Sequence, residues 1–280
     1  MAETGGAGEA ARILWQLWSE GETIDHLPRH CRPQTLDEGW AVQRMLDQYA
    51  GTHAGWKIAA TSAAGQQHIG AGAPLAGRLY DHCVLPSGAR LDADALTMRS
   101  VEAEFAFRVG QDIKWTGETP TPEHLLGAIT NVIPALEVPD SRFNDFRSVG
   151  LPSLLADAMC AAHAVLGQSQ IPNQLLLADQ PVTIRRNGRE VSSGSGALVL
   201  GHPLVALGWL VAELGARGEM LREGDLVLTG AATTPFAIAA GDEVTADFAA
   251  LGTVRASFVG HTSGDEATEP APAAVEQDTD

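Results

Sequence analysis

The sequence predicts an α+β protein in which a helical region comes first and strands follow. Before residue 50, apolar residues recur at the spacing of a helix face. After Gly55, short apolar runs are separated by glycines and polar turns, which is typical of strands. Helices followed mostly by strands favour an α+β fold over alternating β-α-β units. The length of 280 residues, with 45% hydrophobic and 19% charged residues, is that of a globular protein with a substantial core.

The N-terminal region is expected to form a helical cap over residues 9–54. Residues 1–8 are rich in glycine and alanine and are expected to be disordered. A first helix is predicted over about 9–20, and a second begins at Thr35, because Thr35 and Glu38 have the spacing of a capping box. The apolar faces of the two helices consist of Ile13, Leu14, Leu17 and Trp18, and of Val42, Met45, Leu46 and Tyr49.

Residues 55–261 are expected to form a second, strand-rich domain. Its clearest strand is 101–109, in which the odd-numbered residues are apolar while Glu102 and Glu104 lie together on the other face. The run 132–138 is typical of a buried strand, and Asn187-Gly188 predicts a two-residue hairpin turn. The remaining predicted elements are helices over 121–130, over 153–165 and from Pro203, and strands near 226–229, 243–248 and 253–259.

The charge balance excludes some classes of partner. Thirty-five acidic against eighteen basic residues give a net charge of −17. A surface this acidic repels phosphate backbones and anionic lipids, so neither nucleic acid nor a membrane is expected as a partner. The segment 262–280 contains acidic but no basic residues and is expected to be a disordered tail. A cytoplasmic location is expected, because no secretory signal or membrane span is recognisable.

Two glutamates on the predicted strand 101–109 are the clearest candidates for chemistry. The carboxylates of Glu102 and Glu104 project from one face, roughly 6.5–7 Å apart along the strand. Glu137, near the end of the run 132–138, is a third acid on a strand predicted to be buried. Three carboxylates without histidine or cysteine suit a hard cation, Mg²⁺ or Mn²⁺. Spacing alone also allows ordinary salt bridges to Arg108 or Arg142.

Lys57 is the second candidate. It lies between Trp56 and Ile58 on a predicted strand, and the chain contains only one other lysine, Lys114. A lysine on a buried strand must be paired or have a lowered pKa, and either state suits acid/base chemistry. The alternative is a surface lysine on an edge strand whose stem lies along apolar neighbours.

Other reactive residue types give weaker signals. Cys31, Cys83 and Cys160 are widely spaced, which predicts reduced structural thiols. The glycine-rich run 194–203 matches no nucleotide-binding motif and predicts a turn where backbones approach closely. His163 and His202 lie in apolar segments and are expected to be core or helix-capping residues.

Taken together, these segments resemble the 2-keto-4-pentenoate hydratase and 4-oxalocrotonate decarboxylase family, within the fumarylacetoacetate hydrolase superfamily. The likeness covers about residues 36–260. It rests on six ordered segments, namely 55–62 (GWKIAATS), 101–107 (VEAEFAF), 135–143 (ALEVPDSRF), 194–203 (GSGALVLGHP), 222–230 (REGDLVLTG) and 251–258 (LGTVRASF).

The resemblance implies a fold and a set of site residues. The implied fold is a mixed β-roll that follows an N-terminal helical region. The implied metal ligands are Glu102, Glu104 and Glu137, and the implied acid/base or carboxylate-orienting residue is Lys57. Thr61, Ser62 and Thr229 are the implied substrate-binding residues.

The resemblance also implies an activity, with two departures from the family pattern. The expected substrate is a small anionic 2-oxo acid or its dienol, hydrated to a 4-hydroxy-2-oxo acid by a metal-dependent enzyme. Leu75 stands where family hydratases usually carry an acid, and Ala158 stands where they carry asparagine. Decarboxylation of a 2-oxo diacid therefore remains an alternative, as does a catalytically weak partner of an active paralogue. Trp15, Trp18 and Trp40 on the cap suggest a homo-oligomer.

Overall fold

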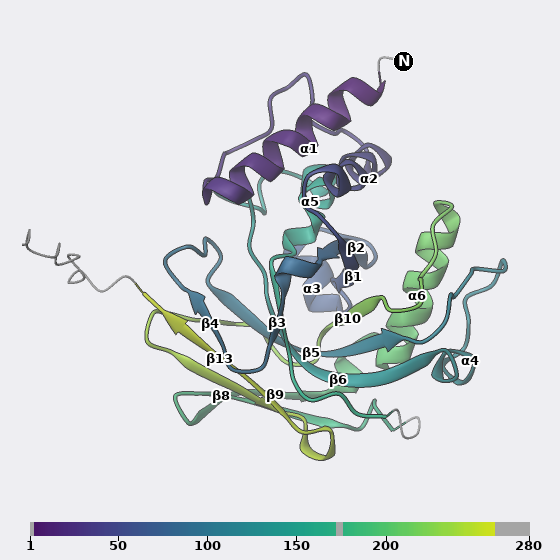
Figure 1. The fold of residues 1–280 in the computed structure, drawn as a ribbon, viewed down its shortest axis with the longest axis vertical. Helices are drawn as coiled ribbons and strands as arrows, with labels where there is room; N and C mark the ends of the chain where they lie inside the picture. Colours follow the sequence, from purple (N-terminus) through teal and green to yellow (C-terminus); the bar gives the residue numbers. More distant parts are fainter. Residues whose placement is uncertain (1–2, 172–175, 261–280) are drawn as a thin grey trace, which may run out of the picture.

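The computed structural model describes residues 3–171 and 176–260. The predicted tail 262–280 lies outside this part of the chain. The fold is α+β, with several helices gathered at one end, two curled sheets below them and further helices beside the sheets (Figure 1). The predicted fold class is therefore confirmed.

Three helices cover one end of the sheets (Figure 1). They are α1 (Glu3–Glu20), α2 (Leu36–Met45) and α5 (Leu151–Ala156). The predicted capping box is present, because the Thr35 hydroxyl accepts from the Glu38 amide while the Glu38 carboxylate accepts from the Thr35 amide. Helix α1 begins at Glu3, so the expectation of disorder was wrong for residues 3–8. Packing explains this, since Ala10 and Ala11 are fully buried and tertiary burial outweighs the weak helix propensity of glycine.

The larger sheet has the order β2-β1-β10-β5-β6-β7-β3, and β11 pairs with β5. It is mixed, because β1 runs parallel to β10 and β3 to β7, whereas the other pairs are antiparallel. Its strands are β1 (His53–Ala59), β2 (Leu75–Tyr80), β3 (Val84–Pro86), β5 (Ser100–Val109), β6 (Ile129–Val138), β7 (His163–Leu166), β10 (Leu226–Ala231) and β11 (Phe236–Ala237).

The smaller sheet has the order β4-β13-β12-β8-β9. Its strands are β4 (Ala89–Asp92), β8 (Pro181–Arg186), β9 (Arg189–Ser195), β12 (Glu243–Asp247) and β13 (Thr253–Val259). The two sheets share a core in which Phe105 of β5 meets Phe248 edge to face, with ring centroids 5.1 Å apart and both side chains fully buried. The predicted hairpin is confirmed, because Asn187 and Gly188 between β8 and β9 both have positive φ.

Three further helices complete the fold: α3 (Ala63–Ile69), α4 (Pro122–Leu126) and α6 (Pro203–Ala216). Short 3-10 turns span Leu46–Gln48, Asp81–Cys83, Ala158–Cys160, Gly196–Leu198 and Ala249–Leu251. Helix α6 packs against β10 and α4. Residues 196–216 are the one candidate membrane span among the described residues, and half of that window is buried inside the fold, as in the core helix of a globular protein.

The helix predicted over 153–165 was wrong beyond Ala156. Ala158, Met159 and Cys160 all have positive φ, of 47°, 52° and 61°, so the chain makes a left-handed turn there. The segment from His163 then pairs with β6 as β7. The helix predicted over 121–130 also ends early, at Leu126, because β6 begins at Ile129. In both places strand pairing with a distant segment outweighs the local helical pattern.

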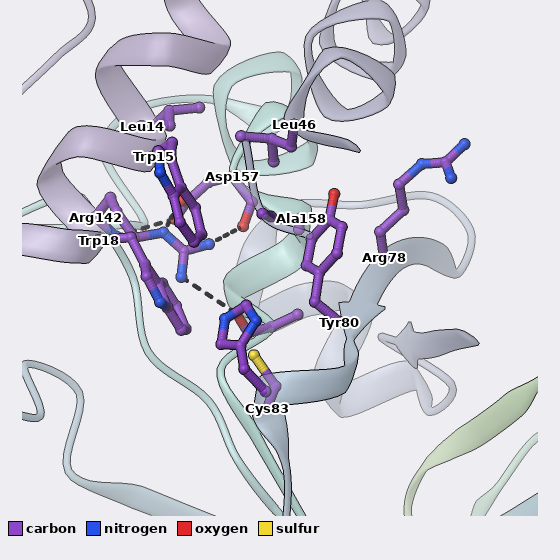
Figure 2. A pocket seen from close by; sticks show the side chains of 13 residues that line it. Leu14, Trp15, Trp18, Leu46, Arg78, Tyr80, Cys83, Arg142, Asp157 and Ala158 are labelled. Atoms are coloured by element: carbon purple, nitrogen blue, oxygen red, sulfur yellow. Dashed lines mark hydrogen bonds and ion pairs between the residues drawn. The ribbon is translucent and has the colours of Figure 1, made fainter. Parts of the chain in front are cut away.

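A buried ion pair fixes the left-handed turn beneath α1. Arg142 pairs with the fully buried Asp157, and its guanidinium also donates to the carbonyl groups of Asp157 and Ala161. The guanidinium carbon lies 4.4 Å from the centroid of the Trp18 ring, and Figure 2 shows it beside the tryptophans of α1. Trp40 is also buried within the chain, stacked on Trp56, so it offers no free surface to a second copy.

Candidate metal and substrate site

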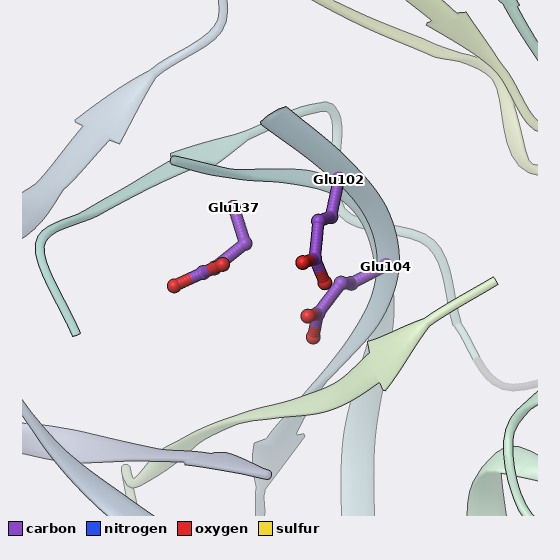
Figure 3. Close-up of side chains that lie close together, drawn as sticks. All are labelled: Glu102, Glu104 and Glu137. Carbon is purple, nitrogen blue, oxygen red and sulfur yellow. The ribbon is translucent and has the colours of Figure 1, made fainter. Parts of the chain in front are cut away.

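Three carboxylates converge where β5 and β6 run side by side. Glu102 lies directly opposite Glu137 in the antiparallel register, and Glu104 follows two residues along β5 on the same face. One oxygen from each of the three side chains lies within 4.8 Å of the other two. Figure 3 shows the carboxylates of Glu102 and Glu104 pointing toward that of Glu137. This spacing allows one cation to contact all three.

The cluster holds more negative charge than the surrounding protein compensates. Glu104 is 1% exposed and Glu137 is fully buried, while Glu102 is partly exposed. Burial raises the pKa of all three carboxyl groups, and that of Glu137 rises to about 7 although Lys57 opposes the shift. Among the described residues Oε2 of Glu137 has no hydrogen-bond partner. Buried carboxylates in this state favour a bound cation, and an all-oxygen donor set fits Mg²⁺ or Mn²⁺.

Lys57 is the cation that the fold itself places beside the cluster. Its Nζ lies 3.0 Å from Oε1 of Glu137 and donates to the carbonyl of Met159 at 3.1 Å. Lys57 is 5% exposed, so it is not the surface lysine of the alternative interpretation. Burial lowers its pKa, but the attraction of Glu137, Glu102 and Glu104 outweighs burial and the net shift is upward. Lys57 therefore carries its proton at neutral pH in this arrangement.

The salt bridges considered for the glutamates are not formed. Arg142 is engaged by Asp157, and Arg108 donates to the carbonyl of Gly224. Within the described part of the chain, Lys57 is the only basic residue with an ion pair to the cluster. The local electrostatics therefore leave a deficit of positive charge at this point.

A bulge in β10 supports Glu104. The register between β10 and β5 shifts between Leu228 and Ala231, and the amide of Gly230 donates to Oε2 of Glu104 at 2.7 Å. Gly230 has a φ of +100°, and a Cβ there would lie 2.0 Å from the Thr61 hydroxyl oxygen. Only glycine allows Thr61 to approach this closely. The segment 222–230 thus contributes to the site through its backbone.

A cavity of about 600 Å³ adjoins the cluster. Lys57, Glu102, Glu104, Thr61 and Ser62 all line it, so the fold brings together most of the residues selected from the sequence. Glu137 is not among the residues that line the cavity, but one of its carboxylate oxygens lies within 4.8 Å of oxygens of Glu102 and Glu104. Thr229 is not brought to the cavity, because it is fully buried and its hydroxyl donates to the carbonyl of Phe105.

The left-handed turn contributes two lining residues that the sequence interpretation missed. Met159 lines the cavity and supplies the carbonyl that accepts from Lys57, and Cys160 lines the same wall. Burial raises the pKa of the Cys160 thiol to about 12, with a further contribution from Asp157, so this thiol stays protonated. The predicted structural role of the cysteines agrees with this, because all three are free and buried. No local pattern in the sequence signals a run of three positive φ angles.

Several other residues named from the sequence have packing or capping roles in the structure. Leu75 pairs with Ala59 at the end of β2, is 8% exposed and does not line the cavity. His202 caps α6, since its Nδ1 accepts from the Leu204 amide. In the run 194–203, a Cβ at Gly194 or Gly196 would lie about 2 Å from a backbone carbonyl oxygen, as expected for a close approach of backbones.

Comparisons with known proteins agree with this architecture. Residues 68–259 match the family described as fumarylacetoacetate (FAA) hydrolase C-terminal. A 2-keto-4-pentenoate hydratase from Paraburkholderia xenovorans (strain LB400) is 32% identical over 255 residues, which cover 89% of this chain and 94% of that protein. A 4-oxalocrotonate decarboxylase from Pseudomonas putida is 32% identical over 222 residues, with 79% and 83% covered.

Solved structures place the chain in the same group. The structure of 4-oxalocrotonate decarboxylase from Pseudomonas putida G7, complexed with magnesium and adipate, superposes with a TM-score of 0.83 at 28% identity and covers 90% of this chain and 97% of that one. The family match spans more than half of the chain, and the curated relatives exceed 30% identity over most of both lengths. The chain therefore belongs to the fumarylacetoacetate hydrolase family, in the group that contains the 2-keto-4-pentenoate hydratases and 4-oxalocrotonate decarboxylases.

Proposed function

We propose that this protein is a divalent-metal-dependent hydro-lyase that converts a 2-hydroxy-dienoic acid into a 4-hydroxy-2-oxo acid. One observation carries the proposal: three carboxylates with oxygens within 4.8 Å of one another, paired with a buried lysine, lie at the wall of a cavity of about 600 Å³. A solvated acidic face would need neither the burial nor the adjoining cavity. The relatives named above include hydratases of this type.

Glu102, Glu104 and Glu137 are the proposed holders of Mg²⁺ or Mn²⁺. The three side chains offer only oxygen donors, which these hard ions prefer. When bound, such an ion supplies positive charge that stabilises the enolate form of a 2-oxo acid. The amide of Gly230 fixes one oxygen of Glu104, which orients the carboxylate before any ligand arrives.

Lys57 is the proposed acid/base and carboxylate-orienting residue. Lys57 forms an ion pair with Glu137 and donates a hydrogen bond to the carbonyl of Met159. Because an ammonium group has three N–H donors, Lys57 can also donate to a ligand in the cavity that it lines. Thr61 and Ser62 line the same wall and are proposed to bind the polar end of the substrate.

The reaction balances with these residues and one water molecule. A proton added to C5 of 2-hydroxypenta-2,4-dienoate, with loss of the proton of the 2-hydroxyl group, gives an α,β-unsaturated ketone. The oxygen of water then bonds to C4, a proton reaches C3, and the product is 4-hydroxy-2-oxopentanoate. Because Leu75 and Ala158 carry no titratable group, Lys57 is expected to hold or deliver the proton at the substrate carbons.

The test uses the metal-loaded full chain with 2-hydroxypenta-2,4-dienoate and, separately, with 2-oxohex-3-enedioate. The expected result is formation of the 4-hydroxy-2-oxo acid from the first compound. The loss of dienol absorbance monitors the reaction, and product analysis identifies the acid. Release of CO₂ from the second compound without hydration of the first would overturn the proposal in favour of decarboxylation. The structural likeness to 4-oxalocrotonate decarboxylase favours that activity as the second candidate.

Failure to convert either compound while Mn²⁺ still binds would instead favour a partner subunit without its own activity. A homo-oligomer is also proposed, and sedimentation of the full chain measures its size.

A further inference from the structure

Most of the cavity lining beyond the glutamates is apolar, and Ser100, Thr233 and Thr234 add hydroxyl groups to it. Apolar side chains from α3, α5 and four connecting segments form the wall there: Ile69, Met98, Phe146, Leu154, Leu198 and Pro235. Leu154 is 2% exposed and belongs to the buried core, so this side chain is a fixed part of the wall. An apolar wall stabilises the part of a ligand that carries no charge.

The basic side chains of the cavity lie in two places: beside Glu102 and Glu104, which we call the glutamate end, and at an exposed position. Among the described lining residues, Lys57 and His68 are the only basic side chains. Lys57 is engaged by Glu137 and Met159, whereas His68 is exposed and its ring contacts Phe146 at 5.8 Å between centroids. No arginine lines the described part of the cavity, so a second carboxylate of a ligand would have no fixed cation to pair with.

The cavity is also larger than a five-carbon acid requires. Pockets of roughly 300–1,000 Å³ typically enclose drug-sized ligands, and this one is about 600 Å³. A pentadienoate held by the glutamate end would leave most of the apolar wall without a partner.

We propose that the cavity preferentially binds 2-oxo acids or dienols whose far end is uncharged, apolar and longer than that of pentadienoate, and that Ile69, Phe146 and Leu154 select this end. The proposal rests on the proposed function for the position of the 2-oxo acid end. It excludes diacids as the preferred substrates.

The first experiment measures binding without chemistry. Three inert 2-oxo acids are titrated into the Mg²⁺-loaded full chain by calorimetry: 2-oxobutanoate, 2-oxohexanoate and 2-oxoadipate. Burial of two more methylenes, at ~0.8 kcal/mol each, is expected to make 2-oxohexanoate bind about 15-fold more tightly than 2-oxobutanoate. The chain-matched diacid 2-oxoadipate is expected to bind at least about 30-fold more weakly than 2-oxohexanoate, because its second carboxylate loses water without gaining a cation.

The second experiment reverses the preference. Ile69 lies on α3, a helix in which no residue is fully buried, so Ile69→Arg is expected to fold and to place a guanidinium at the wall. This variant is expected to gain at least about 10-fold in affinity for 2-oxoadipate. Val205→Arg is the matched control, because Val205 is 40% exposed on α6 and does not line the cavity. His68→Gln tests whether the exposed histidine pairs with a second carboxylate, and no change in 2-oxoadipate affinity is expected.

The outcomes separate this inference from the proposed function. Equal affinity of the native chain for 2-oxohexanoate and 2-oxoadipate, or a loss of 2-oxoadipate binding in His68→Gln, would overturn the inference even if hydration is observed. Retention of the apolar preference in binding, without turnover of any dienol, would overturn the proposed reaction and leave the inference standing. A cavity that binds all three acids equally tightly would show that its apolar wall contacts none of them.

Discussion

Nζ of Lys57 lies 3.0 Å from Oε1 of Glu137, and both side chains are buried in the larger sheet. The two residues come from β1 and β6, which are separated in the sheet by β10 and β5. Glu137 therefore faces two partners at once, Lys57 on one side and Glu102 across the strand pair on the other. This shared position couples the lysine to the carboxylate cluster, so a change in either is expected to alter the other.

Replacement of Lys57 tests its role in proton transfer. Lys57→Met keeps the length and the apolar stem, so the fold and Mn²⁺ binding are expected to persist while turnover falls by ~10²-fold or more. Steady-state kinetics on a dienol that the native protein converts measures the loss. Lys114→Met is the matched control, because Lys114 is exposed and is the only other lysine. A change in turnover of less than a factor of a few in Lys57→Met would contradict the assigned role.

Removal of one carboxylate is expected to have opposite effects with and without metal. Glu104→Gln should weaken Mn²⁺ binding by about 100-fold, since ligand charge sets affinity for such ions. In chelator, the same change should raise the melting temperature, because burial raises the pKa of Glu104 and repulsion by Glu137 and Glu102 raises it further.

Electron paramagnetic resonance of Mn²⁺ and thermal unfolding in chelator measure the two effects. Glu118→Gln is the control at an exposed position. Unchanged Mn²⁺ affinity in Glu104→Gln would place the metal elsewhere.

Gly77 is expected to be required for the left-handed turn beside Lys57. A Cβ at Gly77 would lie 2.0 Å from the carbonyl oxygen of Ala158 and 3.2 Å from Cγ of Lys57. Gly77→Ala should therefore lower the free energy of unfolding by more than about 3 kcal/mol, because the backbone at Ala158 and the side chain of Lys57 must both move. Urea unfolding measures the loss, and Gly72→Ala, where a Cβ meets nothing within 4 Å, is the control. Equal free energies of unfolding for the two variants would show that the backbone at Ala158 moves at little cost and would contradict the prediction.

The part of the site on one strand could be predicted from the sequence. Alternation along 101–109 places Glu102 and Glu104 on one face. This placement could be predicted because residues two apart share a face in any strand, whatever the strand pairs with. The α+β class was predicted from the order of helical and strand patterns and is confirmed. The catalytic, metal-binding and substrate-binding roles, and the division into a cap of 9–54 and a β-roll of 55–261, stay predictions.

The parts that depend on contacts between distant segments could not be predicted from local pattern. The pairing of Glu137 with Glu102 is a matter of register between β5 and β6, which the resemblance implied but spacing did not. The turn at Ala158–Cys160 interrupts a sequence with a helical pattern, because the buried pair of Arg142 and Asp157 and the pairing of β7 with β6 outweigh it. The acceptor for Lys57 is a backbone carbonyl, which no side-chain motif reveals.

His53 is an acid-sensitive position outside the site. Its ring packs edge to face on Trp56 at 5.1 Å, and its Nδ1 is buried without a hydrogen-bond partner in the described structure. Burial lowers the pKa of His53 to about 4, with smaller contributions from Arg78 and Arg222. Protonation of this side chain therefore disfavours the folded state.

The sign of the resulting pH dependence follows from the lowered pKa. Above about pH 6.5 His53 is neutral in both states, so its contribution to stability is complete. As the pH falls from about 6.5 to about 4, the unfolded chain binds a proton that the folded protein does not, and stability falls by up to about 3 kcal/mol.

His53→Phe should remove this part of the acid sensitivity, so the difference in unfolding free energy between pH 7.5 and pH 5 should be smaller than in the native protein. Urea unfolding at both pH values measures it, and His26→Phe, at an exposed position, should leave the native difference unchanged. An equal loss of stability on acidification in His53→Phe and the native chain would assign the acid sensitivity to other groups.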